Sequence, residues 1–173
     1  MNKIIVEFEN ISAGWLQIDI YDYRSEEIRR MRVSYLQSFF RDLYMACKFL
    51  LSDIEGIYEI PIEQEGFDAY FKFYKYEDKI MAVELSEDFF EDEIPYDGSK
   101  EEWKRFEDEE KVPSVITYFN VEIKEFVSNI ILLLGKHRIS YNEGFALTEE
   151  EKFTEEQLKE LVSLFQKKFL KGG

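Results

Sequence analysis

Apolar and polar side chains alternate along much of the first half of the chain, which is the pattern of half-buried β-strands. Residues 15–21 show it best, with Leu16, Ile18 and Ile20 on one face. We expect this face to point toward the core, because successive side chains of a strand point to opposite sides. Similar runs predict further strands at residues 3–9, 27–35, 57–63, 67–76 and 80–86.

The spacing of these runs predicts antiparallel pairing. Short polar turns separate residues 15–21 from residues 27–35, as in a hairpin, and the three later runs follow one another as a meander. Pro61 places residues 57–63 at a sheet edge, since proline cannot donate a hydrogen bond to a neighbouring strand.

A helical pattern lies between the two groups of strands. From residue 36 to residue 54, apolar side chains recur at intervals of three and four, which indicates a helix pressed against a core. Ser34 and Gln37 fit a capping box, in which each side chain satisfies a backbone amide at the start of a helix. Gly56 marks its end. The apolar stripe consists of Leu36, Phe39, Phe40, Leu43, Ala46, Cys47, Leu50, Leu51 and Ile54.

A second helix is predicted over residues 121–134. Asn120 is a favourable N-cap, and Gly135 stands where a glycine commonly ends a helix. The preceding residues 112–119 fit either a strand or an approach to this helix. Residues 136–147 are expected to form a connector.

A third helix is predicted at the end of the chain. Thr154 and Gln157 form a second capping box, and apolar residues follow at helical spacing. Lys167 and Lys168 lie in its last turn, where positive charge complements the helix dipole.

Together these elements predict the α+β class. We expect an antiparallel sheet of about five or six strands, made of the N-terminal hairpin and the central meander, with two or three helices packed on one face. A chain of 173 residues fits a single domain over residues 1–173. Within it, residues 84–111 are expected to be an acidic connector.

Charge narrows the classes of partner. The net charge is −15, and residues 84–111 alone hold 13 carboxylates and four basic side chains, a net of −9. Such a charge argues against nucleic acid and against an anionic membrane surface, and it favours a basic protein partner. Cys47 is the only cysteine, and the first residues do not resemble a secretory signal, so we expect a cytoplasmic protein.

The acidic connector does not match an EF-hand. The best register puts Gly98 at the sixth loop position, which leaves Pro95 at the third and Lys104 at the twelfth, where oxygen ligands are required. A looser divalent-cation site stays open, because hard cations prefer clustered oxygen ligands. Its members would be Glu91, Asp92, Glu93 and Asp97.

Catalytic motifs are not found. His137 is the only histidine, which excludes metal sites built on several histidines, and no glycine-rich phosphate loop is present. A nucleophilic pair of Cys47 and His137 is weighed against a simpler interpretation, since Cys47 lies on the apolar stripe of its helix. Arg30 and Arg32 share a strand face and would hold an anion or pair with neighbouring carboxylates. We therefore predict no catalytic residue, no cofactor and no metal ligand.

The acidic connector also carries aromatic side chains. Trp103 and Phe106 stand three residues apart, so on a helical turn they would share one face. Either they fold back onto the core, or they form an interface anchor surrounded by charge. The residues predicted to contact a protein partner are Glu91, Asp92, Glu93, Asp97, Trp103 and Phe106.

The resulting functional hypothesis is a non-enzymatic acidic protein-binding module. Its concrete form would be an immunity or inhibitor protein that covers the cationic surface of a basic partner, because opposite charges accelerate association. One alternative is a carboxylate-based hydrolase or a divalent-cation-binding protein. Another is an oligomeric structural protein.

Overall fold

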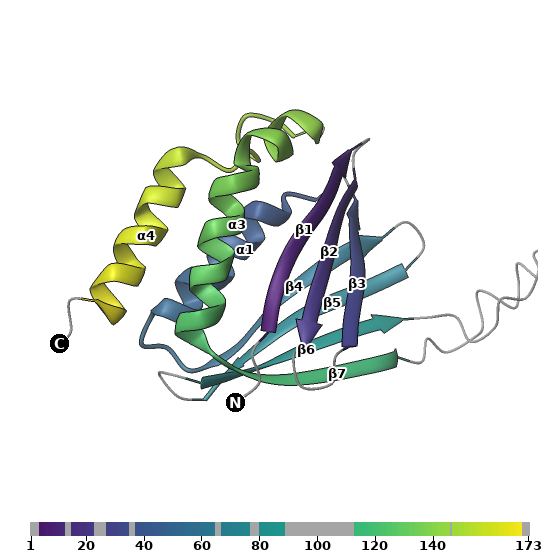
Figure 1. Cartoon of the computed structure of the whole chain (residues 1–173), viewed down its shortest axis with the longest axis horizontal. Coiled ribbons are helices and arrows are strands. Elements are labelled where there is room, and N and C mark those ends of the chain that lie inside the picture. The colour runs from purple at the N-terminus through teal and green to yellow at the C-terminus, as the bar shows by residue number, and fades with distance from the viewer. Residues whose placement is uncertain are drawn as a thin grey trace, which may run out of the picture.

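The computed structural model of the protein has the α+β class (Figure 1). Three strands come first: β1 (Ile4–Ser12), β2 (Trp15–Asp22) and β3 (Glu27–Ser34). Helix α1 (Phe39–Leu51) and strand β4 (Gly56–Gln64) follow. The remaining elements are β5 (Phe67–Lys75), β6 (Ile80–Asp88), β7 (Pro113–Glu122), α3 (Ile123–Gly144) and α4 (Glu155–Phe169). The structure describes residues 4–12, 15–22, 27–34, 37–64, 67–76, 80–88, 113–145 and 147–170.

The strands of the described residues form two antiparallel sheets. One has the order β1-β2-β3 and the other the order β4-β5-β6-β7. A single sheet of five or six strands, as predicted, is therefore not confirmed, although β3 contacts β4. The hairpin and the meander were each predicted from local spacing, whereas the joining of one to the other depends on contacts that the spacing does not encode. The edge position predicted from Pro61 is confirmed, because β4 is the first strand of its sheet.

Strand β2 is the centre of the three-stranded sheet. Its predicted inward face is confirmed, since Leu16, Ile18 and Ile20 are all buried. Asp19 points to the opposite face, yet it is only 1% exposed and accepts a hydrogen bond from the Gln17 side chain at 3.2 Å. The alternating pattern does not predict a buried carboxylate at this position.

Helix α1 begins later than the apolar stripe indicates. Ser34 is the last residue of β3, so the predicted capping box of Ser34 and Gln37 is wrong. Gln37 is buried, and its amide nitrogen donates instead to Asp42 at 2.9 Å and to the carbonyl oxygen of Pro61. Ile54 lies beyond the helix and is exposed.

Helix α3 starts two residues later than predicted and ends ten residues later, at Gly144. Asn120 belongs to β7, and α3 continues through Gly135 to Gly144. Its second half is held by tertiary contacts: the Tyr141 ring stacks on Phe40 at 3.8 Å, and its hydroxyl donates to the Gln37 carbonyl oxygen at 2.7 Å. The predicted connector over residues 136–147 is therefore largely helical.

Helix α4 starts as predicted. Thr154 accepts a hydrogen bond from the backbone amide of Gln157 at 3.2 Å, and the Gln157 side chain accepts one from the Thr154 amide at 2.9 Å. Figure 1 shows α4 as the outermost helix, and it packs against α1 and α3. The hydrophobic core lies on the other side of these two helices, between them and the strands.

Candidate functional site

The residues predicted to form the protein interface lie outside the described residues. So does most of the acidic connector, although its first five residues, 84–88, belong to β6. The interface prediction and the looser divalent-cation site therefore both remain predictions. The residues concerned are Glu91, Asp92, Glu93, Asp97, Trp103 and Phe106.

A second acidic segment, which our sequence prediction missed, is described in full but for residue 146. Residues 143–160 carry seven glutamates and two lysines, a net charge of −5. Together with the −9 of residues 84–111, they hold 14 of the 15 excess negative charges. A running sum of charge along the chain would have found this segment.

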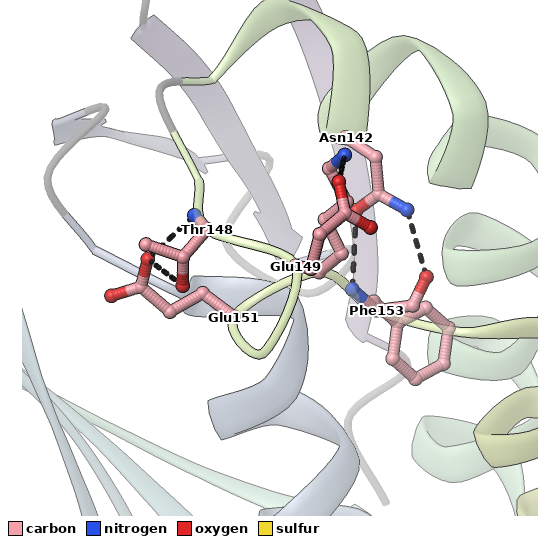
Figure 2. A network of polar contacts seen from close by, with 6 residues as sticks. Asn142, Thr148, Glu149, Glu151 and Phe153 are labelled. Carbon is pink, nitrogen blue, oxygen red and sulfur yellow. Dashed lines mark hydrogen bonds and ion pairs between the residues drawn. The ribbon is translucent and has the colours of Figure 1, made fainter.

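The segment is fastened to the end of α3 by one asparagine (Figure 2). The Asn142 side chain donates to the carbonyl oxygen of Phe153 at 2.8 Å and accepts from the Phe153 amide at 3.1 Å. The Phe153 ring is fully buried and contacts the rings of Phe40 and Tyr44, with centroids 6.2 and 5.9 Å apart. Phe153 is thus held twice: its backbone is hydrogen-bonded to Asn142, and its ring is packed in the core.

A turn at residues 148–151 fixes the tip of the segment. One Glu151 carboxylate oxygen accepts hydrogen bonds from the Thr148 amide and hydroxyl, each at 2.8 Å, as Figure 2 shows. These bonds hold the pKa of Glu151 below its usual value. The Arg41 side chain donates to the carbonyl oxygen of Glu150, which ties the turn to α1. The backbone of this turn is therefore held in place, and Glu149 and Glu150 are exposed on it.

Only part of this charge is neutralised by neighbours. Glu155 pairs with Lys159 at 2.7 Å and lies 3.6 Å from Arg138. Glu160 accepts from Lys48 at 2.7 Å and from the Tyr44 hydroxyl at 2.6 Å, which lowers the pKa of the Glu160 carboxyl. Ion pairs within the described part of the chain do not reach the exposed Glu143, Glu150 and Glu156. We call residues 143–160 the helix-side acidic surface.

The predicted nucleophilic pair has no support in the geometry. Cys47 is fully buried on α1, and burial raises the pKa of its thiol, which opposes formation of the reactive thiolate. His137 lies inside α3 rather than beyond its end, with its ring edge-on to Phe8 at 6.0 Å. Burial, and then the charge of Lys136, lower the pKa of His137. Its Nε2 atom is buried without a hydrogen-bond partner in the described part of the structure.

Three glutamates of the helix-side acidic surface also do not resemble a general acid. Where the pKa of a glutamate shifts, at Glu151, Glu155 and Glu160, it shifts downward, whereas a general acid at neutral pH needs a raised pKa. Within the described ranges, no three histidine, cysteine, aspartate or glutamate side chains gather closely enough to hold a metal ion.

The strand register bears on the two arginines of β3. Arg30 stands opposite Asp19, and Arg32 stands opposite Gln17. Anion binding and carboxylate pairing both stay predictions for Arg30 and Arg32, because their side chains are outside those that the structure describes.

Comparisons with known proteins find no relatives. No protein-family model matches the chain, and no curated protein or solved structure matches it significantly. Among the helices that the structure describes, none has the length and apolar character needed to cross a membrane.

Proposed function

We propose that this chain is a non-enzymatic, cytoplasmic acidic module that binds a basic protein partner, as an immunity or inhibitor protein does. The observation that carries the proposal is the concentration of charge. Two short segments hold nearly all of the net −15, and one of them, the helix-side acidic surface, is displayed on a hydrogen-bonded backbone.

Such an arrangement suits fast, charge-guided association. Clustered charge of one sign raises the rate at which an oppositely charged protein arrives, roughly 10- to 1,000-fold, and salt suppresses the gain. The fastening of residues 142–154 lowers the entropy lost on binding, because the backbone is already ordered in the free protein. Glu150 and Glu156 are exposed and have no ion-pair partner among the described residues, so they are available for a cationic side chain.

The first experiment identifies the partner. The full chain is immobilised and incubated with extract of the source cell at low and at high salt. We expect a basic protein that is retained at low salt and released at high salt. Retention that does not depend on salt, or a captured protein that is itself acidic, would contradict the proposal.

The second experiment measures association kinetics with the captured protein. The triple variant Glu143→Lys, Glu150→Lys, Glu156→Lys should associate at least roughly tenfold more slowly at low salt, with a smaller change in dissociation. The matched control reverses three exposed glutamates elsewhere, Glu7, Glu55 and Glu125, and so changes the net charge equally.

A parallel variant tests the interface predicted from the sequence. Reversal of Glu91, Asp92 and Glu93 should also slow association if residues 84–111 contact the partner. If the control triple slows binding as much as the other two, net charge alone drives association and neither segment is the interface.

A further inference from the structure

Among the elements that the structure describes, the helices pack against only one face of the four-stranded sheet. Its inner face carries Ile60, Phe71 and Phe73, which are buried, and Phe73 contacts Phe126 of α3. Side chains of a strand alternate between faces, so the intervening residues point away from the helices. Two large hydrophobic side chains on this side are widely exposed: Ile57 is 62% exposed, and Tyr76, just beyond β5, is 64% exposed.

This outer face already holds one ammonium group. The Lys72 Nζ atom lies 3.2 Å from a carboxylate oxygen of Glu59 on the neighbouring strand. It also lies 5.1 Å from the centre of the Tyr70 ring, within the range of a cation–π contact. The face therefore combines carboxylate and tyrosine in the geometry that receives a lysine side chain.

Two further tyrosines, Tyr74 and Tyr76, lie at the end of β5 and just beyond it. The Tyr74 and Tyr76 rings are 6.2 Å apart with an interplanar angle of 19°. Ile57 is the register partner of Tyr74, so the apolar and aromatic side chains adjoin at this corner of the sheet. Tyrosine is enriched at protein interfaces because it offers a large apolar body together with a polar group.

By strand register, acidic residues outnumber basic ones at the positions of this face. Glu84 of β6 stands opposite Lys72, and Tyr118 of β7 stands opposite Glu84. Five acidic positions and one lysine occupy this face across the four strands. The acidic positions are Glu59, Glu63, Asp68, Glu84 and Glu122.

We propose that the outer face of the β4–β7 sheet, which we call the sheet face, docks an arginine- or lysine-rich segment of a protein partner. The inference rests on the proposed function, since it names the part of a basic partner that would be recognised and a second place where it binds. Charge complementarity selects this occupant. A second copy of the chain would bring a net −15 against −15, and like charges oppose association.

The test uses the full chain labelled with ¹⁵N and a short oligo-arginine peptide as the probe, with an oligo-glutamate peptide as the control. We expect the largest chemical-shift changes at Glu59, Tyr74 and Tyr76, diminishing with added salt. Glu59→Gln and Tyr76→Ala should each weaken binding roughly two- to fivefold, the range of one exposed cation–π or ion-pair contact.

Matched variants control for net charge and for loss of apolar surface. Glu125→Gln removes an exposed carboxylate from α3, and Leu132→Ala removes an exposed apolar side chain there. Both should bind the peptide as the parent does. Circular dichroism and thermal unfolding of each variant separate lost binding from lost folding.

The outcomes distinguish this inference from the proposed function. If oligo-arginine shifts only residues outside the sheet face, and Glu59→Gln and Tyr76→Ala bind as the parent does, the inference fails while the proposed function stands. If oligo-arginine does not bind and no basic protein is captured from extract, both fail. A dimer seen by light scattering that Tyr76→Ala dissociates would make the face a self-interface and overturn the inference.

Discussion

Gly135 offers a sharp test of the fold, because two accounts of this residue predict opposite effects of one substitution. As the end of a helix over residues 121–134, it would adopt a left-handed conformation that alanine tolerates poorly. In the structure it lies inside α3, which runs from Ile123 to Gly144, where glycine is less favourable than alanine by about 0.5–1 kcal/mol.

The surroundings of Gly135 leave room for a methyl group. A Cβ atom added there would lie 3.5 Å from Cδ2 of Leu158 on α4, an ordinary van der Waals contact. No steric cost therefore offsets the gain in helix propensity. We expect Gly135→Ala to raise the free energy of unfolding by about 0.5–1 kcal/mol, and the melting temperature by roughly 1–4 °C for a chain of this size.

Urea denaturation followed by circular dichroism measures this change, with the denaturant slope expected to stay constant. Gly56→Ala is the opposite control. Gly56 has φ of +142° and nothing within 4 Å of an added Cβ, so only backbone strain acts, and we expect a loss of about 1–3 kcal/mol. If Gly135→Ala lowers stability as Gly56→Ala does, α3 does not continue through residue 135.

Three further predictions concern single side chains. Thr154→Ala should cost about 1 kcal/mol of stability in urea denaturation, because it removes the side-chain half of the capping box with Gln157, whereas Thr154→Ser should cost much less. Burial lowers the pKa of His137, so the unfolded chain binds a proton at this residue before the folded chain does as the pH falls. The free energy of unfolding should therefore decline below about pH 6.5. His137→Leu should remove that decline between about pH 7.5 and 5.5, where no other histidine titrates. An equal decline in the variant would contradict this account. Cys47 should react with iodoacetamide only slowly in the native protein and quickly in urea, because its thiol is buried and its pKa raised; fast native labelling would restore the nucleophile hypothesis.

Local patterns in the sequence predicted those features that depend on near neighbours. The inward face of β2 follows from alternation at Leu16, Ile18 and Ile20, and the start of α4 follows from Thr154 and Gln157, three residues apart. The same kind of motif failed at Ser34 and Gln37, because β3 extends through Ser34 and the Gln37 amide binds Asp42 and Pro61 instead. A capping motif therefore predicts a helix start only where no strand or distant acceptor competes for its residues.

Of the candidate binding surfaces, some could be predicted from the sequence and one could not. Composition alone located the acidic connector and would have located residues 143–160, since charge is a property of the sequence. The sheet face could not be predicted in this way. Glu59, Tyr70 and Lys72 are brought together by the register of β4 and β5, and their exposure depends on which face the helices cover.

The sequence by itself determined the α+β class, the main strands and helices, and the excess of negative charge. Only the tertiary structure decided that α3 continues past Gly135, that Asp19 is buried, and that the described strands divide into two sheets. The physical reason is the range of the interactions. Alternation and capping act over a few residues, whereas the contacts of Tyr141 with Phe40 and Gln37 each span more than one hundred positions and exist only once the chain has folded.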